Sequence, residues 1–356
     1  MPRGLSRSLA CPILAAAALF LAGCTAGAAP GDLGEPESSS TGSAESPATE
    51  SSASVAPRSD YPITVDNCGT EVQVNEPPQR IVTIKSTSTE MVLALGLGDR
   101  LVGTAFSDGP MPQWLQQDVP VLAEEVPSSE AVLAKKPDFI FAGWESNFSA
   151  DGAGTRGELA DLGIDTYVSP AACLQPPYQP DPLTFDHVFD YIQQVGNLLG
   201  VPQRAADLIE EQRATLAEVD SSDTEMTALW YSSGSDTPFV GGGIGAPQML
   251  MDAVGLTNIM TDVHESWASA SWEAIAAQDP DVLVLVDSSW NSVEHKIEVL
   301  ESNPVTATMT AVQQQRYLVL PFPASEAGVR SVPAAVDLSE QLNQLAGDDD
   351  GQSGQQ

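Results

Sequence analysis

One pattern occurs twice in this chain of 356 residues and decides the fold. It reads SEAVLAKKPDFI at residues 129–140 and WEAIAAQDPDVL at residues 272–283, with the same spacing from Glu to Pro-Asp. Each copy predicts a short helix with Glu in its first turn, a proline that stops the helix, and a buried strand. Ordinary capping explains either copy alone. The matching register of the two copies favours two lobes built on one plan.

Strands and helices alternate around both copies. Such alternation predicts parallel sheets covered by helices. The predicted strands are residues 81–84, 101–105, 138–142 and 164–168, then 227–231, 281–286 and 317–320. The predicted helices are residues 89–95, 129–134 and 155–162, then 246–254, 271–277, 293–300 and 327–345. A hairpin is expected before them, with strands at residues 63–65 and 72–74.

Two helices without an intervening strand separate the two βα regions. Thr184 can cap the first helix, Gly200 ends it, and Pro202 suits the first turn of the second. The chain is therefore expected to form an α/β lobe at residues 61–183, connector helices at 184–220 and a second α/β lobe at 221–346. Residues 347–356 are expected to form a disordered tail.

The N-terminal residues predict export and anchoring. Residues 1–23 combine two arginines with an apolar run too short to span a membrane, and end in Leu-Ala-Gly before Cys24. This resembles a bacterial lipoprotein signal peptide, which implies that Cys24 is lipidated. An ordinary signal peptide is the alternative. Residues 24–60 have almost no large apolar side chains and are expected to form a flexible tether that holds the protein on the outer face of the cell membrane.

The charge of the chain excludes one class of partner. There are 14 Lys and Arg residues against 49 Asp and Glu residues, a formal net charge of −35. A nucleic-acid-binding protein needs a basic surface, so nucleic acid is not an expected partner. Attraction to anionic lipid is excluded for the same reason, which leaves the lipid anchor as the predicted membrane contact.

The cysteine count agrees with an oxidising compartment. Once Cys11 and Cys24 are set aside, Cys68 and Cys173 remain, and an even pair in an exported protein predicts a disulfide. Two free thiols are the alternative, because sequence spacing does not show that the residues are close.

A family resemblance rests on several stretches. Residues 80–84 and 89–103, together with the junctions KKPD at 135–138 and DPD at 279–281, resemble the cobalamin and ferric-siderophore class of ABC-transporter solute-binding proteins. The resemblance implies two Rossmann-like lobes joined by a rigid helical connector, with the ligand in the cleft between them. It also implies an ABC permease dimer with its ATPase as partner. In that class one Glu from each lobe pairs with the permease, and Glu130 and Glu273 hold the matching positions.

Further stretches resemble one actinobacterial branch of this class. They are residues 143–152, 169–173, 230–238 and 294–298. That branch is proposed to bind the deazaflavin coenzyme precursor F(420)-0, so the resemblance implies this ligand. Ferric siderophore, haem or cobalamin is the alternative, although polyanionic siderophores usually require more basic residues than this chain offers.

Candidate ligand-binding residues follow the predicted strands, because open α/β sheets bind ligands at strand carboxyl ends. Aromatic rings there can stack on a flat ligand, while hydroxyls, helix-start N–H groups and scarce cations can hold its polar groups. Each aromatic residue could instead pack in the core, and each hydroxyl could merely cap a helix. The candidates are Lys85, Ser86, Thr87, Ser88, Trp144, Trp230, Tyr231, Ser232, Trp290 and Arg330.

Catalysis, metal binding and cofactor binding find little support. No G-x-S-x-G, Walker or H-E-x-x-H motif is present, and the three histidines are far apart in sequence. The run GAGTRG at residues 152–157 matches a nucleotide fingerprint but lies about ten residues beyond its strand. We therefore expect a monomeric binding protein without metal or cofactor. A cell-surface enzyme and a surface interaction protein are the competing hypotheses.

Overall fold

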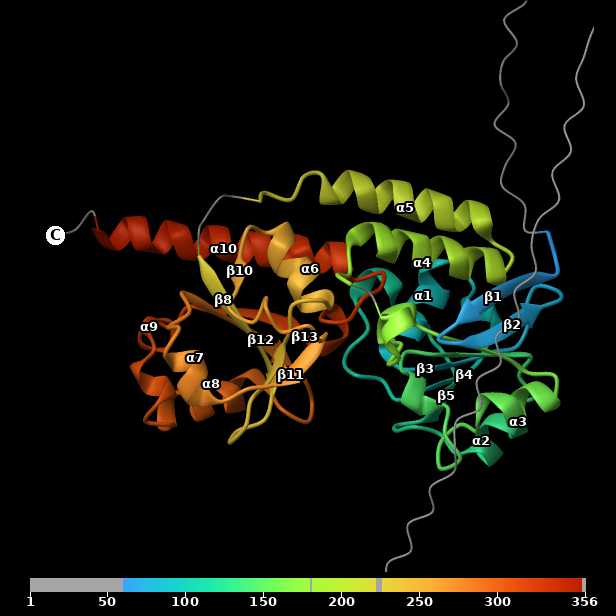
Figure 1. The fold of residues 1–356 in the computed structure, drawn as a ribbon. Coiled ribbons are helices and arrows are strands. Elements are labelled where there is room, and N and C mark those ends of the chain that lie inside the picture. The colour runs from blue at the N-terminus through green and yellow to red at the C-terminus, as the bar shows by residue number, and fades with distance from the viewer. Residues whose placement is uncertain (1–59, 180, 222–225, 354–356) are drawn as a thin grey trace, which may run out of the picture. The chain divides into compact units, whose positions relative to one another are not determined.

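The computed structural model describes residues 60–179, 181–221 and 226–353 (Figure 1). These residues belong to one compact unit of the chain. The predicted signal peptide, the lipidation site Cys24 and almost all of the tether lie outside the described residues. No helix of the described part of the chain is both long and apolar enough to cross a membrane.

The first lobe is built on a parallel sheet in the order β5-β4-β3-β6-β7. Every residue of β3 and β6 is buried, because helices cover both faces of the sheet. The strands are β3 (Ile81–Ile84), β4 (Leu101–Ala105), β5 (Val121–Ala123), β6 (Phe139–Ala142) and β7 (Asp165–Val168). The helices are α1 (Ser86–Ala94), α2 (Ser129–Ala134) and α3 (Arg156–Asp161), and the antiparallel hairpin of β1 (Ile63–Asn67) and β2 (Thr70–Val74) precedes them.

The second lobe has a mixed sheet in the order β11-β9-β8-β12-β13, with β10 also paired to β8. β12 lies parallel to β8 and β13, whereas β9 is antiparallel to β8. The strands are β8 (Thr227–Ser233), β9 (Phe239–Gly241), β10 (Thr257–Asn258), β11 (Trp267–Ser269), β12 (Val282–Asp287) and β13 (Tyr317–Pro321). The helices are α6 (Ala246–Ala253), α7 (Trp272–Ala276), α8 (Val293–Ser302), α9 (Thr310–Gln313) and α10 (Ser331–Ser353).

Helices α4 (Phe185–Leu198) and α5 (Pro202–Leu216) lie between the lobes in sequence and side by side in Figure 1. Thr184 caps α4, as predicted, by accepting a hydrogen bond from the His187 N–H. A Cβ at Gly196 would lie 2.3 Å from the Cβ of Ala205, so this glycine lets the two helices pack closely. Gln212 of α5 donates to the carbonyl of Val329 in the second lobe, and Arg204 of the same helix lies 2.5 Å from where a Cβ at Gly96 of the first lobe would be, so α5 contacts both halves of the fold.

The repeated sequence pattern has the same local structure in both lobes. Ser128 caps α2 and Ser271 caps α7, each by accepting from the N–H three residues ahead. After each helix the residue before proline has a left-handed backbone, with φ of 49° at Lys136 and 45° at Asp279. The two copies therefore agree in backbone conformation as well as in sequence.

The aspartate after each proline ties the repeat to the neighbouring strand. Asp138 accepts hydrogen bonds from the N–H groups of Gln79 and Arg80 just before β3. Asp281 accepts from the N–H of Thr227 at the start of β8, at 2.7 Å. Because β3 pairs with β6 and β8 pairs with β12, the same contact sets strand position in each lobe.

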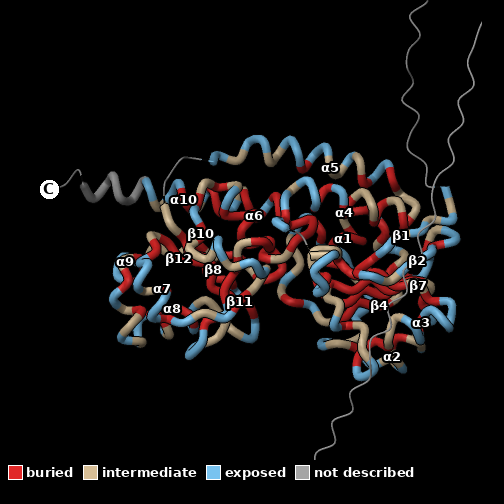
Figure 2. Tube along the Cα trace, in the orientation of Figure 1, coloured by how far each residue is buried: buried red, intermediate tan, exposed pale blue. Residues whose placement is uncertain are grey.

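The core is continuous through both lobes. One cluster of buried side chains contains Phe139 and Phe141 of the first sheet together with Val282 and Val284 of the second. Separate clusters fill the opposite face of each sheet. Figure 2 shows the sheets as the buried centre, with exposed residues along the covering helices.

The predicted cysteine pair is joined in this structure. Cys68 in the turn of the first hairpin is bonded to Cys173 in the loop after β7, with their Cα atoms 5.2 Å apart. Both residues are buried beside Val168. The bond therefore ties the hairpin to the edge of the first sheet.

Several elements differ from the prediction. The short strands β5, β9, β10 and β11 were not expected, because two or three residues are too few to show a periodic pattern. The first helix begins at Ser86 rather than Thr89. The expected disordered tail from Gly347 is corrected in part, since α10 continues to Ser353. The sequence after Gly347 contains no proline that would stop a helix already begun.

Candidate functional site

A cavity of about 1350 Å³ lies between the two lobes. Clefts that hold drug-sized ligands usually measure ~300–1,000 Å³, so this one has room for a larger molecule. Its first-lobe wall consists of the segments that follow β3, β4, β5, β6 and β7, which is the edge where open α/β sheets bind ligands. The second-lobe wall comes from the end of β8, from β9 and β11, and from the segments after β12 and β13.

Lys85 lies on the cavity wall inside a cage of aromatic rings. Its Nζ is 3.4 Å from the ring centroid of Trp144, 4.1 Å from that of Phe106 and 5.2 Å from that of Phe322. Phe322 belongs to the second lobe, so the ammonium group contacts both lobes. The Lys85 side chain is fully buried and forms a salt bridge with Asp108. Its charge is therefore already paired.

The backbone at Lys85 is strained to reach this position. Its φ of 85° lies in a region that side-chain-bearing residues rarely adopt. A Cβ at Gly143 would lie 2.7 Å from the Cβ of Lys85, so a glycine is required where the side chain passes β6. Strain of this kind concentrates at functional sites.

Asp108 occupies the N-terminus of α1. Its carboxylate accepts a hydrogen bond from the Ser86 N–H at 3.2 Å, and its own N–H donates to the Ser86 hydroxyl at 2.9 Å. Burial raises the pKa of Asp108, and the adjacent Lys85 ammonium opposes that rise. The helix start that we expected to bind a ligand anion therefore already holds a carboxylate of the protein.

Three hydroxyl-bearing residues after β3 were predicted to bind the ligand, namely Ser86, Thr87 and Ser88. Of these, only Thr87 lines the cavity. Ser88 donates to the carbonyl of Ile84 at 2.7 Å and Ser86 is bonded to Asp108, so both hydroxyls have partners within the first lobe. The expectation that Ser86 and Ser88 face the ligand is thus corrected, because both side chains are buried and their hydroxyls are hydrogen-bonded within the first lobe.

Two of the predicted tryptophans line the cavity. Trp144 donates from Nε1 to Glu326 Oε1 at 2.6 Å across the two lobes. Trp290 is 51% exposed on the opposite wall, with its ring centroid 4.9 Å from that of Phe322. A row of ring contacts therefore crosses the cavity from Phe106 through Trp144 and Phe322 to Trp290.

Glu326 is the most perturbed carboxyl group of this wall. Its pKa is raised to about 7, chiefly by burial and also by Asp108 and Glu90, although Lys85 and the hydrogen bond from Trp144 lower it. Its second oxygen, Oε2, is buried without a hydrogen-bond partner. The group therefore titrates near neutral pH at the contact between the lobes.

Trp230 and Tyr231 do not reach the cavity, and that expectation is wrong. Both side chains are fully buried in the core on opposite faces of the second sheet. β8 continues to Ser233, two residues further than predicted, so the strand end that meets the cavity carries Ser232 and Ser233 instead. β8 is a central strand and must be covered on both faces.

Arg330 also lies outside the cavity lining. Its guanidinium forms a buried bidentate ion pair with Glu90 of α1, and it donates to the carbonyl of Pro110 at 2.8 Å. Burial raises the pKa of Glu90, which the hydrogen bond from Arg330 opposes. This predicted ligand-binding residue therefore holds the two lobes together.

Several lining residues were missed. Phe106 and Phe322 directly follow β4 and β13, so the rule that selected Lys85 and Trp144 could have found them. Phe239 and Trp267 form a stacked pair with centroids 6.0 Å apart, and they were missed because β9 and β11 were not expected. The charged residues missed on the wall are all acidic, namely Glu124, Glu125, Glu145, Glu265 and Glu326.

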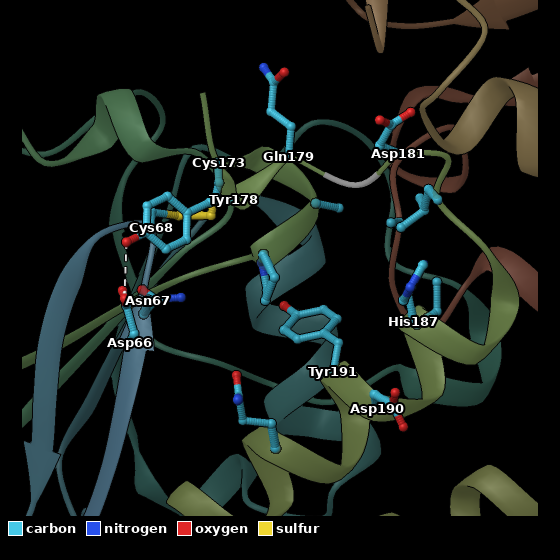
Figure 3. A pocket seen from close by; sticks show the side chains of 16 residues that line it. Asp66, Asn67, Cys68, Cys173, Tyr178, Gln179, Asp181, His187, Asp190 and Tyr191 are labelled. Atoms are coloured by element: carbon cyan, nitrogen blue, oxygen red, sulfur yellow. Dashed lines mark hydrogen bonds between the residues drawn. A yellow bond between two sulfur atoms is a disulfide. The ribbon is translucent and has the colours of Figure 1, made fainter. Parts of the chain in front are cut away.

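A smaller pocket of about 430 Å³ adjoins the cavity and shares Cys173 and Gln179 with it (Figure 3). Figure 3 shows the Tyr178 hydroxyl bonded to Asp66 beside the disulfide, at 3.0 Å. Asp181 and Asp190 also line this pocket. The smaller pocket therefore adds further carboxylates next to the cavity, beneath the loop after β7.

The two glutamates of the repeat are exposed in the first turns of α2 and α7. Glu130 and Glu273 therefore present equivalent carboxylates, one on each lobe. Within the described residues, no cluster of three or more His, Cys, Asp or Glu side chains is arranged to hold a metal ion.

Two sheet-based lobes, a helical link and a large cleft at the strand ends define a two-lobed ligand-binding protein. The periplasmic binding protein family model matches residues 81–324, and the chain belongs to this family. The family consists of non-catalytic substrate-binding proteins of ABC transporters, so this protein is a solute-binding protein of ABC import.

Three relatives illustrate the similarity. An uncharacterised ABC transporter substrate-binding lipoprotein of Bacillus subtilis is 24% identical over 79% of this chain and 86% of its own. A vitamin B12-binding protein of Yersinia pestis is 25% identical over 58% of this chain and 69% of its own. The crystal structure of an ABC-type Fe3+-hydroxamate transport system from Saccharomonospora viridis is 26% identical, covers 80% of this chain and 99% of its own, and superposes with a TM-score of 0.67.

Proposed function

We propose that this protein captures a bulky, ring-bearing organic ligand between its two lobes and delivers it to an ABC importer. One observation carries the proposal: a cavity of about 1350 Å³ at the strand carboxyl ends, with aromatic side chains on both walls. Rings of Trp144, Trp290 and Trp267 offer flat surfaces for stacking. The volume suits a macrocycle or an iron chelate better than a small metabolite.

The ligand candidates come from the relatives and from the sequence. The vitamin B12-binding protein supports cobalamin, and the Fe3+-hydroxamate transport system supports a ferric siderophore. Haem belongs to the same size class. The deazaflavin precursor F(420)-0 stays a candidate because a flat ring can stack on the exposed indoles. None of the relatives named above has a deazaflavin in its name.

The predicted anchor fits this role. A lipid on Cys24 and the tether after it would keep the binding domain on the extracellular face of the membrane, near the importer. The Bacillus subtilis relative is named as a lipoprotein. Replacing Cys24 by Ser should release the protein into the medium, which fractionation of the producing cells would show.

Titration of the folded domain tests the ligand. Cyanocobalamin, ferric hydroxamates, haem and the deazaflavin precursor are added separately while tryptophan fluorescence is recorded. One-to-one saturable binding of at least one compound is expected, and Trp144→Ala should weaken it. Saturation by none of the four would contradict the proposed ligand class.

Glu130 and Glu273 are the proposed contacts with the permease. A two-lobed protein that meets a two-fold membrane partner must present matching groups, and an exposed carboxylate can accept two hydrogen bonds from an arginine. The double variant Glu130→Arg/Glu273→Arg should keep its ligand affinity but lose uptake and ligand-stimulated ATPase activity. A matched pair on α5, Glu210→Arg/Glu211→Arg, controls for the change in net charge. Normal uptake with the first pair would exclude the docking role.

A further inference from the structure

We infer that the cleft selects neutral and cationic ligands and discriminates against anionic ones. The inference rests on the proposed function, because it concerns the ligand held between the lobes. It starts from the charged groups of the cleft and from how each of them is already paired.

The two features that usually bind an anion are both used by the protein itself. Lys85 is the only cationic side chain among the described residues that line the cavity, and it is fully buried in its salt bridge with Asp108. The N-terminus of α1 is taken by the same aspartate through the Ser86 N–H. A ligand phosphate or carboxylate would have to displace Asp108 to reach either group. That would leave a buried carboxylate without its partner, which is costly.

The second helix that begins at the cavity offers no better anion site. α6 starts at Ala246, and Pro247 in its first turn has no N–H to donate. Glu265 also lines the wall, one residue before Ser266, which packs against Gly245 at the helix start. A ligand anion at this helix would therefore approach a carboxylate.

The remaining charges of the cavity wall are negative. Glu124, Glu125 and Glu265 are exposed there, and Glu145 accepts a hydrogen bond from the Leu174 N–H. These groups would repel an anionic ligand, whereas a cation would gain from them. The net charge of −35 acts in the same direction at longer range.

The aromatic lining also favours cations. Phe239, Trp267 and Trp290 all line the cavity, and Phe239 and Trp290 are exposed by 40% and 51%. Ring faces carry partial negative charge and attract ammonium groups. The protein already uses this attraction in the cage around Lys85. Neutral cobalamin and neutral or cationic ferric hydroxamates therefore fit the cleft, whereas haem and the phosphate-bearing deazaflavin precursor are disfavoured.

A charge series on one scaffold tests the inference. Ferrioxamine B carries a terminal ammonium group, its N-acetyl derivative is neutral, and its N-succinyl derivative is anionic. The neutral cyanocobalamin and its amine-bearing and carboxylate-bearing derivatives form a second series. We expect the cation to bind at least about tenfold more tightly than the anion at low salt. The ratio should shrink at high ionic strength, because the glutamates on the wall are exposed.

A matched pair of variants locates the effect. Glu124→Gln/Glu125→Gln/Glu265→Gln should compress the cation-to-anion ratio severalfold. Glu210→Gln/Glu211→Gln/Glu218→Gln changes three exposed glutamates outside the cavity lining and should preserve the ratio. Equal binding of cation and anion by the wild-type protein, or equal compression in both variants, would overturn the inference while the proposed function stands. If no compound of either scaffold binds but haem or the deazaflavin precursor does, the inference is overturned and the proposed function stands. Binding of none of these compounds would overturn both.

Discussion

The two lobes share one structural unit and differ in what surrounds it. In both, a serine-capped helix, a left-handed residue, a proline and an aspartate lead into a central strand, β6 in the first lobe and β12 in the second. Beside β3 the first lobe has the parallel strand β4. Beside β8 the second lobe has the antiparallel β9 and the short β10.

That difference determines what each lobe contributes to the cleft. In the first lobe every lining residue follows a strand at its carboxyl end. In the second lobe the chain reverses at Gly234, with φ of 84°, and β9 brings Phe239 back beside the end of β8. The repeated unit therefore builds the scaffold, whereas the non-repeated segments supply most of the aromatic and acidic lining.

The ion pair between the lobes should have the largest effect on stability. Arg330→Met leaves Glu90 buried without a partner and should lower the free energy of unfolding by about 3–5 kcal/mol. Urea unfolding followed by circular dichroism measures this loss and shows whether the lobes begin to unfold separately.

Two controls accompany this variant. Glu90→Leu/Arg330→Met removes both charges and should recover most of the loss. Arg213→Met breaks an exposed pair with Asp186 and should cost no more than about 1 kcal/mol. A loss in Arg330→Met as small as that in Arg213→Met would contradict the proposed role of Arg330 in linking the lobes.

The disulfide lies in the first lobe and should have the next largest effect on stability. It closes a loop between residues 105 positions apart in the first lobe, so Cys68→Ser/Cys173→Ser should cost about 2–5 kcal/mol. Hydrogen exchange should show lost protection around β1, β2 and β7, with little change in the second sheet. Two freely alkylated thiols in protein exported by its host would show that the bond does not form there.

Glu326 should make stability depend on pH. Its pKa is raised from 4.5 to about 7 in the folded protein, so the folded state holds a proton that the unfolded state releases. Stability contributed by this group is therefore greatest below about pH 4.5 and declines as pH rises to about 7, by up to roughly 3 kcal/mol in total.

The variant Glu326→Gln isolates that contribution. The difference in unfolding free energy between wild type and variant should change between pH 5 and pH 8 and stay constant above. Glu210→Gln, at an exposed position on α5, serves as the control. A parallel pH profile for wild type and Glu326→Gln would rule out this titration.

The smallest effect compares the two left-handed residues of the repeat. Lys136→Gly should stabilise the protein by up to about 1 kcal/mol, because glycine adopts the left-handed backbone without strain. Asp279→Gly should destabilise it, since the Asp279 carboxylate accepts hydrogen bonds from the N–H and hydroxyl of Thr310. Thermal unfolding of both variants measures the two effects. Shifts of the unfolding temperature with the same sign would show that the two positions are equivalent.

Much of the scaffold was predictable from the residues. β3, β4 and α2 have the predicted bounds, and the cap at Thr184 and the helix start at Pro202 lie where the sequence places them. Local chemistry determines these features, because caps, prolines and apolar periodicity act within a few residues. The short strands β9 and β11 carry no such pattern, and their pairing depends on distant parts of the chain.

The site was predictable only in part. Lys85, Thr87, Trp144, Ser232 and Trp290 line the cavity as expected, since each lies at or beyond the end of a strand. The sequence could not show that Asp108 neutralises Lys85 or that Arg330 pairs with Glu90 across 240 positions. Nor could it distinguish a core Trp230 from a tryptophan on the cavity wall.

The sequence by itself determined the two-lobe plan, the positions of most strands along the chain and the family, because these depend on local periodicity and repeated motifs. Only the tertiary structure decided which charges remain available to a ligand. Lys85, Asp108, Glu90 and Arg330 are all charged in the sequence. Folding brings them together in pairs and buries them, and the glutamates of the wall stay exposed. The charge that a ligand encounters therefore depends on which charged residues form pairs in the folded protein. The amino-acid composition alone does not determine those pairs.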